Sequence, residues 1–435
     1  MTPGSISISA SKIVDMLIDA RERTLALVED LDDEQIMGPR LRIVNPLRWE
    51  IAHVAWFQER WALRHLRGKE PIRAEVDLLY DSALVAHDTR WDLPLFSRKE
   101  TLLYMRRVLE RVIEEIGDRD TTGEELYFHL LPIFHEDMHC EAITYTRQTL
   151  GYPAPCRGPF VRPDGQSAAH AGSVRGDVEI PGGEFLLGAV PGSGFVFDNE
   201  KWAHPVRLAP FRMARAATTQ SEFAEFVDDG GYERDEFWSE AGRSWRESTR
   251  AEHPVYWGRD AAGKWLRRNF DEWVGLEPHH PVLHVNWYEA DAYCRWAGRR
   301  LPTEAEWEMA AAAEPGSRAK RKYPWGSTEP DSKRANLDWR FLGCVDVGAH
   351  PEGDSAAGCR QMTGNVWEWT ADSFGPYPGF VIDPYKEYSA PWFGDHKVLR
   401  GGCWVTRSRL IRNTWRNFYT PDRRDVWCGF RTCAL

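Results

Sequence analysis

The strongest chemical signal in the sequence is a pair of histidines, His135 and His139, within the string HEDMH. The surrounding segment, residues 124–150, is predicted to be a helix that stops at Gly151 and Pro153. Because residues four apart share one face of a helix, both imidazoles can bind the same metal ion. The spacing therefore predicts a metal site on this helix.

The same string matches the HExxH pattern of zinc proteases, in which the glutamate acts as general base. That chemistry needs a third ligand downstream, either a histidine after a glycine turn or a glutamate. The residues after His139 read CEAIT, and the next glutamate after Glu141 is Glu179, beyond a segment rich in proline and glycine. The sequence therefore disfavours a zinc hydrolase, which stays an alternative.

A candidate third ligand lies upstream. His53 stands in the apolar string WEIAHVAWF, within a helix predicted after Pro46 and ending by Gly68. A histidine on such a face is often a core residue, but antiparallel packing of the two helices would bring it opposite His135. Three neutral imidazoles on one side of an ion leave positions open for substrate and dioxygen. His129, six residues before His135, should point elsewhere and is interpreted as structural.

Four helices must position these residues. Periodic apolar residues predict helices at 8–31, from Pro46 to Gly68, at 98–116 and at 124–150, with a long connection at 69–97. This pattern is typical of a helix bundle.

The second part of the chain has a different composition. Residues 1–176 contain four of the 21 tryptophans and the rest follow, in a region of short strands with only two predicted helices, at 219–229 and 287–297. Residues 151–176 are rich in proline, glycine, alanine and serine, as linkers are. We predict a first domain at 1–155, a linker at 156–177 and a second domain at 178–435.

The overall composition excludes several classes. The formal net charge of −11 argues against binding to nucleic acid or to an anionic membrane surface. No stretch approaches the roughly 20 apolar residues that span a bilayer, and the first residues, MTPGSISISASKIVD, do not resemble a secretory signal. The eight cysteines form no CxxC motif. We therefore expect a cytoplasmic protein with no membrane or nucleic-acid partner.

The two parts resemble two known families. The first resembles DinB-like four-helix proteins, whose metal triad is one histidine on the second helix and an HxxxH pair on the fourth. The second resembles the formylglycine-generating-enzyme (sulfatase-modifying-factor) domain, through HVNWYEA (284–290), GRRLPTEAEWE (298–308), GNVWEWT (364–370), RGGCW (400–404) and GFR (429–431). The resemblance implies an α + (α+β) fold, with a DinB-like four-helix bundle followed by a loop-rich, C-type-lectin-like domain.

The resemblance does not extend to formylglycine generation itself. Formylglycine generators carry two copper-binding cysteines just after the RGGS motif. The corresponding stretch here reads RGGCWVTRSRLI and has no thiol after Cys403. Since this domain is catalytic in some proteins and structural in others, its fold does not name the reaction.

The fused order of the two domains resembles the ergothioneine-type sulfoxide synthases and the related selenoneine synthases. In that family, a non-haem Fe(II) held by three histidines joins a sulfur or selenium donor to C2 of the hercynine imidazole, using O2. The resemblance implies Fe(II) as cofactor and His53, His135 and His139 as its ligands. Open positions on the iron would hold the reacting partners together.

Three positions depart from the sulfur enzymes. Met138 replaces a glutamine that meets hercynine, and only Arg90 matches the two arginines that bind the γ-glutamylcysteine carboxylates. Tyr419 replaces an aspartate that helps to hold the donor amine. Fewer charged anchors favour a selenosugar as donor over γ-glutamylcysteine or cysteine. The alternative is that these positions changed without changing the substrate.

The resemblance also suggests substrate and proton contacts. Asn417 and Phe418 would contact hercynine, with an aromatic face suited to its trimethylammonium group, and Trp415 is a further candidate. Loop packing explains these residues nearly as well. Tyr377 is a candidate proton donor, although the alignment can place Phe380 at that position instead.

We therefore predict an Fe(II)- and O2-dependent oxidoreductase that forms a C–Se bond, or alternatively a C–S bond, at hercynine. Its active site is expected between the two domains, where pockets prefer to form. A second alternative is a non-catalytic metal-binding adaptor.

Overall fold

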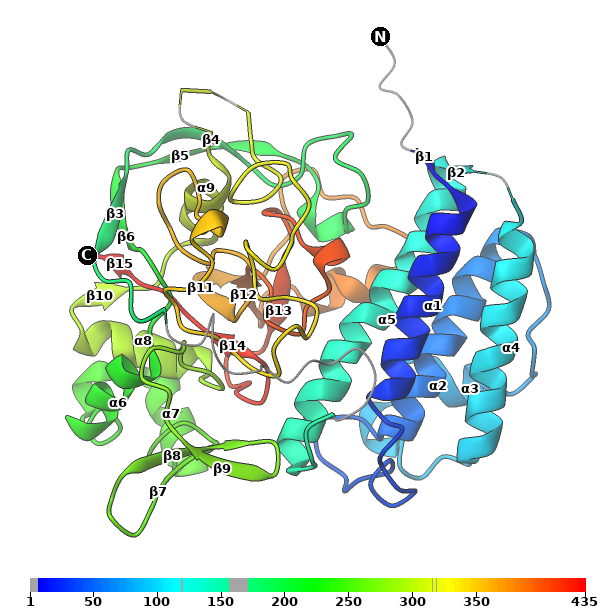
Figure 1. Cartoon of the computed structure of the whole chain (residues 1–435), viewed down its shortest axis with the longest axis horizontal. Helices are drawn as coiled ribbons and strands as arrows, with labels where there is room; N and C mark the ends of the chain where they lie inside the picture. The colour runs from blue at the N-terminus through cyan, green and yellow to red at the C-terminus, as the bar shows by residue number, and fades with distance from the viewer. Residues whose placement is uncertain (1–6, 119, 156–170, 315, 318) are drawn as a thin grey trace. The chain divides into compact units, whose positions relative to one another are not determined.

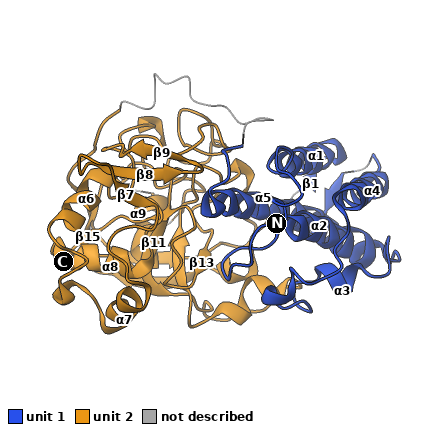
Figure 2. Ribbon diagram, turned by 90° about the horizontal axis from the view of Figure 1, so that it is seen from below, with its two compact units in different colours: residues 1–160 blue, residues 161–435 orange. Residues whose placement is uncertain are grey.

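The computed structural model describes residues 7–118, 120–155, 171–314, 316–317 and 319–435. The chain divides into two compact units, residues 1–160 and residues 161–435, shown in blue and orange in Figure 2. The division falls inside the segment predicted as a linker, much of which, residues 156–170, lies outside the described residues. The first unit is mainly helical, with one short pair of strands, and the second contains the larger sheets (Figure 1).

Within its described residues, the first unit contains four helices of at least twelve residues, which run side by side in Figure 1. Its elements are β1 (Ser7–Ile8), α1 (Ala10–Ala26), α2 (Leu47–Gln58), the π-helix η1 (Glu59–His65), α3 (Val76–Tyr80), the 3₁₀ turn η2 (His87–Thr89), α4 (Arg98–Ile116), β2 (Thr121–Thr122) and α5 (Gly123–Leu150). The predicted helix at 8–31 is shorter, because α1 ends at Ala26. The predicted connection at 69–97 contains α3 and η2.

Local sequence sets the ends of these helices. The Ser9 side chain accepts a hydrogen bond from the backbone N–H of Lys12 at the start of α1. Ser97 and Glu100 form a capping box at the start of α4. Gly151 ends α5 with φ of 66°, a left-handed conformation that favours glycine.

Helix α2 lies at the centre of the first unit. It packs on α4 and α5, and α1 packs on α5. Eleven of its twelve side chains are buried, Trp49 and Ile51 among them. A helix that is apolar on almost every side is buried on every side. The buried polar groups of α2, which include Glu50 and His53, must therefore find their partners inside the protein.

The second unit is built from several small sheets. One has strand order β10-β15-β6-β3, another β13-β12-β11-β14 and a third β7-β8-β9, while β4 and β5 form a separate antiparallel pair. The strands are β3 (Asp177–Ile180), β4 (Gly183–Leu187), β5 (His204–Leu208), β6 (Phe211–Ala214), β7 (Trp257–Arg259), β8 (Trp265–Asn269), β9 (Glu272–Gly275), β10 (Arg299–Arg300), β11 (Trp367–Ser373), β12 (Lys397–Arg400), β13 (Asn417–Tyr419), β14 (Cys428–Gly429) and β15 (Cys433–Ala434).

Helices and short 3₁₀ turns connect these strands. They are η3 (Asp198–Glu200), α6 (Gln220–Asp228), η4 (Asp235–Phe237), α7 (Glu240–Thr249), α8 (Trp287–Trp296), α9 (Glu304–Ala312), η5 (Pro351–Gly353), η6 (Lys386–Tyr388), η7 (Ala390–Trp392) and η8 (Ser408–Leu410). Helices α6 and α8 correspond to the two predicted ones, whereas α7 and α9 were not predicted. Thr303 and Glu306 form the capping box of α9, and this signal is readable in the sequence.

The motif strings of the second unit build its core. Glu304 accepts hydrogen bonds from Arg400, at 2.8 Å, and from Arg416, at 2.7 and 3.0 Å. Glu368 pairs with Arg431 at 2.6 Å and accepts the indole N–H of Trp307. Such buried charges are tolerated only when they are paired and hydrogen-bonded. These motif residues therefore hold the fold together.

In the described part of the chain, no helix has the length and apolar character needed to cross a membrane. The seven described cysteines are buried and form no disulfide with one another.

Candidate metal centre

The three predicted ligands come together inside the first unit. One ring nitrogen from each of His53, His135 and His139 lies within 4.8 Å of the other two. The Nε2 atoms of His135 and His139 are 3.0 Å apart, and the ring of His53 is 5.0 Å from each of the other two rings. Helices α2 and α5, which pack on each other, supply these side chains.

His53 is held by its other ring nitrogen. Its Nδ1 lies 2.8 Å from the backbone carbonyl of Tyr80, the last residue of α3. A carbonyl only accepts, so Nδ1 carries the proton and Nε2 keeps its lone pair. The ring also stacks on the indole of Trp49 at 4.6 Å. The orientation of His53 is therefore fixed from both sides.

His139 is held by a carboxylate. Its Nδ1 contacts Glu50 Oε1, and the other oxygen of Glu50 accepts a hydrogen bond of 2.6 Å from the side-chain amide of Asn45. Burial by itself raises the pKa of Glu50, but the attraction of His139 and the hydrogen bond from it bring that pKa below its ordinary value. A carboxylate that accepts from a ligand histidine is typical of protein metal sites.

His135 is held by packing. Its ring stacks on Phe57 with the two ring centres 3.6 Å apart and the planes 8° from parallel. Burial lowers the pKa of His135 well below its ordinary value, and burial with the nearby His139 lowers the pKa of His53 to about 3. Both imidazoles are therefore neutral at neutral pH, as metal ligands must be.

The donor set fits a first-row transition metal. Neutral imidazole nitrogens suit iron, zinc, copper and nickel, and three of them leave coordination positions open. Nitrogen lone pairs that converge at this separation repel one another in a buried cluster, and a bound cation replaces that repulsion with attraction. The site therefore has the character of a metal centre with room for other ligands.

Glu136, the glutamate of the HExxH match, has other partners. Its carboxylate pairs with Arg21 at 2.8 Å and accepts the hydroxyl of Thr24 at 2.9 Å. Both partners belong to α1. These contacts give Glu136 a structural role, and the zinc-hydrolase alternative stays disfavoured.

Comparisons with known proteins cover both units. Residues 16–143, which include all three histidines, match the DinB superfamily, and residues 164–434 match the Sulfatase-modifying factor enzyme 1-like domain. The hercynine oxygenase of Mycolicibacterium smegmatis is 36% identical over 435 residues, which cover 98% of this chain and 99% of that protein. The hercynine oxygenase of Mycolicibacterium thermoresistibile is 36% identical, over 97% of this chain and 94% of that protein.

The chain belongs to the hercynine oxygenase family. This confirms the family that the motifs indicate. The formylglycine-generating enzyme of Streptomyces coelicolor is also 36% identical, but over only 61% of this chain and 91% of its own.

Two of the predicted substrate residues of this family member lie in the first unit. Met138 is half-buried on α5, three residues after His135 and therefore on the same helical face. Arg90 is buried, and its guanidinium stacks over Trp49 at 3.8 Å and donates hydrogen bonds to Asn45 and to the carbonyl of Val85. The structure thus gives Arg90 internal partners instead of an exposed guanidinium.

The other predicted contacts lie in the second unit. Asn417, Phe418 and Tyr419 form β13, an edge strand of its sheet. Phe418 faces the core and stacks on Phe374 at 4.1 Å, while its two neighbours are half-buried and point to the opposite face. Trp415 is buried against Trp367.

Tyr377, the predicted proton donor, is buried in the core of the second unit. Its hydroxyl donates to Glu304 at 3.2 Å, and the guanidinium of Arg416 stacks on its ring at 4.2 Å. Burial, together with the charge of Glu304, raises the pKa of Tyr377 well above its ordinary value. These contacts give Tyr377 a packing role. Phe380, the alternative position, packs on Phe393 and has no proton to donate.

Glu50 and Asn45 were not identified from the sequence. A signal for Glu50 was present, because it precedes His53 by three residues and so shares its side of α2. The contact of Asn45 with Glu50 depends on how the chain enters α2.

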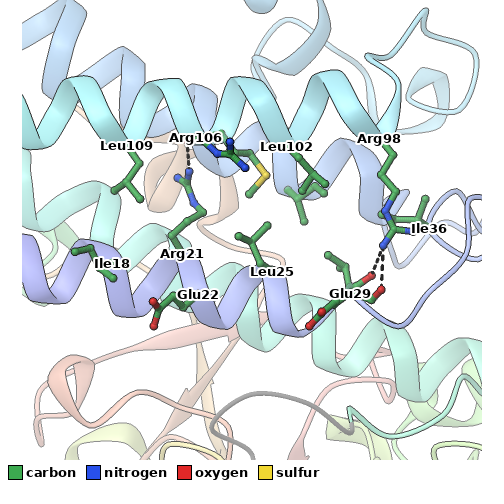
Figure 3. Close-up of a pocket in the computed structure, with 13 residues that line it drawn as sticks. Ile18, Arg21, Glu22, Leu25, Glu29, Ile36, Arg98, Leu102, Arg106 and Leu109 are labelled. Carbon is green, nitrogen blue, oxygen red and sulfur yellow. Dashed lines mark hydrogen bonds between the residues drawn. The ribbon is translucent and has the colours of Figure 1, made fainter.

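A groove in the first unit lies between α1 and α4 (Figure 3). Its volume is about 450 Å³, and leucine and isoleucine side chains, including Leu25, Leu102 and Leu109, point into it. None of the three histidines lines it. The metal centre and this groove are therefore separate features of the unit.

His129 lies outside the histidine cluster, as predicted. It is fully buried, and burial lowers its pKa to about 4. Between pH 6.5 and 4 the unfolded chain binds a proton at this residue that the folded chain does not. Its contribution therefore makes the free energy of unfolding fall as the pH falls through this range. We expect His129→Leu to flatten the pH dependence measured by urea unfolding, and an unchanged slope would contradict this.

Proposed function

We propose that the protein is an oxidoreductase that acts on hercynine and joins a selenium or sulfur donor to its imidazole ring, using Fe(II) and O2. Two observations support this together. Three imidazoles, two of them buried and one half-buried, converge on one point, and the chain matches hercynine oxygenases along nearly its whole length. Family membership alone does not identify the metal, and the donor set alone does not identify the substrate.

His53, His135 and His139 would hold the iron. Iron bound in this way supplies the redox chemistry with O2 that side chains lack. The protein's part is to keep two of these imidazoles neutral through burial, to fix their rings and to leave one side of the site open. Met138 lies beside the ligands on α5, and we propose that it lines the hercynine site.

For the second unit we propose that Asn417 and Tyr419 contact substrate from one face of β13. Phe418, packed on Phe374, supports that strand, and Trp415 supports the segment before it. Tyr377 is assigned a structural role because its hydroxyl is bound to Glu304.

We propose a selenosugar as the donor. The internal hydrogen bonds of Arg90 and the neutral side chain of Tyr419 remove two charges that a dipeptide donor would use. The second candidate is a thiol, γ-glutamylcysteine or cysteine, which would make the enzyme a hercynine sulfoxide synthase. The full-length similarity to hercynine oxygenases favours this candidate.

The test is a direct assay of product mass. Purified protein is loaded with Fe(II) and incubated with hercynine, O2 and one donor at a time: a selenosugar, γ-glutamylcysteine or cysteine. We expect a C–Se product with the selenosugar. Turnover with a thiol alone would select the second candidate, and no O2 uptake with any donor would refute the proposed function. A non-catalytic adaptor would instead contain zinc or nickel, and a zinc hydrolase would keep its activity without oxygen.

The donor assignment makes a prediction about Tyr419. Replacing it with aspartate supplies a carboxylate for a donor amine, and a charge-assisted hydrogen bond contributes roughly 1.5–3 kcal/mol. We therefore expect Tyr419→Asp to raise kcat/KM for γ-glutamylcysteine, relative to the selenosugar, by about tenfold or more. Tyr419→Asn is the matched control, because it removes the ring without adding charge. If the ratio of kcat/KM for γ-glutamylcysteine to kcat/KM for the selenosugar were equal in the two variants, the prediction would be contradicted.

We also propose a cytoplasmic location. The seven described cysteines are buried and form no disulfide with one another, which suits a reducing compartment.

A further inference from the structure

Three residues outside the histidine cluster form one chain of hydrogen bonds that ends at a ligand. Arg90 donates to Asn45 Oδ1 at 2.6 Å, Asn45 Nδ2 donates to Glu50 Oε2 at 2.6 Å, and Glu50 Oε1 contacts Nδ1 of His139. We propose that Arg90, Asn45 and Glu50 are positioning residues that set the orientation of the metal ligands. This inference rests on the metal site of the proposed function.

The direction of donation along these hydrogen bonds follows from which of the groups can donate. Arginine has donors only, so Asn45 must turn its oxygen toward Arg90 and its NH2 toward Glu50. Whatever occupies position 50 must therefore accept from Asn45. A carboxylate accepts there and also accepts from Nδ1 of His139. His139 then carries its proton on Nδ1 and presents the lone pair of Nε2 to the cluster.

Arg90 also supports the second ligand. Its guanidinium lies over the ring of Trp49, and the same ring stacks on His53. The Trp49 indole N–H donates to the carbonyl of Leu79 at 2.7 Å, and Arg90 donates to the carbonyl of Val85. We therefore infer that the guanidinium of Arg90 supports two of the three proposed ligands, His139 through hydrogen bonds and His53 through the ring of Trp49.

The charges are consistent with this arrangement. Burial lowers the pKa of Arg90 to about 10, which still leaves the guanidinium charged at neutral pH. Its positive charge compensates the buried carboxylate of Glu50. Arginine is the residue best suited to such a buried, stacked and hydrogen-bonded position.

The hydrogen bonds between positions 45 and 50 make a specific prediction about exchanging the carboxylate and the amide at these two positions. In Glu50→Gln the new amide faces two donors, so one hydrogen bond is lost, and in Asn45→Asp two carboxylates face each other. Each single variant should bind metal about 10–100-fold more weakly. In the double variant Asn45→Asp/Glu50→Gln, the new carboxylate at position 45 accepts from Arg90 and from the new amide at position 50. The oxygen of that amide accepts from His139, so the pattern is restored and most of the affinity should return.

The measurement is metal affinity without any substrate. Co(II) is titrated into metal-free protein, with its visible absorption as the spectroscopic signature, and Fe(II) is titrated anaerobically in competition with a chelator. Glu59→Gln is the matched control, because Glu59 is a buried carboxylate next to α2 that binds Tyr104 and the backbone N–H of Ile72. It should lose stability but keep wild-type affinity.

Arg90→Met gives a second measurement in which Glu50 itself is left unchanged. A positioning role predicts weaker Co(II) binding and a changed spectrum without donor substrate. A role in donor binding alone predicts wild-type metal affinity and only a raised KM for the donor, which would overturn the inference. Glu50→Gln with wild-type affinity, or a double variant no better than its singles, would also overturn it.

These outcomes separate the inference from the proposed function. Wild-type protein that binds metal but forms no product from hercynine would refute the proposed function. The metal affinities of the variants would still decide whether the three hydrogen-bonded residues position the ligands. Normal turnover of hercynine, with unchanged metal affinity in every variant, would refute the positioning role of Arg90, Asn45 and Glu50 and would leave the proposed function intact.

Discussion

His135→Ala is expected to abolish turnover of hercynine and to leave the purified protein with little bound iron. The substitution removes one of three imidazoles and leaves only two protein ligands. A catalytic metal ion typically contributes several kcal/mol to transition-state stabilisation, so under the proposed function its loss should lower kcat/KM by about 10³-fold or more. Product mass spectrometry and metal analysis of the same sample measure both effects.

His129→Ala is the matched control for this experiment. The two histidines lie on the same helix, α5, and both are buried, but His129 is outside the cluster. Both substitutions should lower stability to a similar degree, while only His135→Ala should lose the metal. If His129→Ala lost its iron as well, or if His135→Ala kept both iron and activity, the three-histidine site would be wrong. Circular dichroism of each variant shows whether the helices are retained.

The helices of the first unit were predictable because their signals are local. The predicted helix at 124–150 corresponds to α5 at Gly123–Leu150, and Gly151 ends it as the sequence indicates. The HxxxH spacing then places two candidate ligands, His135 and His139, on one face of the helix. The contribution of His53 required knowledge of how α2 packs on α5, and a family resemblance supplied it.

The surroundings of the ligands were not predictable in the same way. Arg90 was interpreted as a substrate contact from its place in a family motif, but its partners Asn45 and Trp49 are about 40 residues away in the chain. A contact between residues so far apart in the sequence is not predictable from the local sequence around either of them. The partner of His53, the carbonyl of Tyr80, has no side-chain signature at all.

In the second unit the motifs predicted the fold better than the roles of individual residues. Glu304, within one of the strongest motifs, binds Arg400, Arg416 and Tyr377 in the core. Tyr377 was chosen as a proton donor from its position in a loop, but its hydroxyl is committed to Glu304. A strong motif identifies a buried interaction as readily as a catalytic one, because both depend on fixed geometry.

The string HEDMH illustrates the same point inside one turn of helix. His135 and His139 face α2 and its His53, whereas Glu136 contacts Arg21 and Thr24 of α1. Consecutive residues on a helix are about 100° apart around its axis, so adjacent residues of a motif point to different sides of the helix. The glutamate therefore matches the protease pattern by sequence alone, and its substitution separates the two interpretations.

Glu136→Ala is expected to lower the free energy of unfolding by about 3–5 kcal/mol, because it leaves Arg21 buried without its counter-charge. The side chain of Arg21 is almost fully buried, and its remaining partners are the side-chain oxygen of Gln58 and the carbonyl of Met105. Urea unfolding measures this loss. The iron content and the kcat of the folded fraction should stay close to those of the wild type, since Glu136 does not contact the histidine cluster.

A double substitution decides whether the loss comes from the unpaired charge. Arg21→Met/Glu136→Met replaces the pair with apolar side chains, and such replacements are often neutral or stabilising. We therefore expect the double variant to be more stable than Glu136→Ala, with the interaction energy read from a double-mutant cycle. A double variant no more stable than the single would mean that the other hydrogen bonds of this cluster carry the stability. A loss of kcat in stably folded, iron-loaded Glu136→Ala would instead show that the glutamate takes part in the chemistry, as the HExxH pattern would have it.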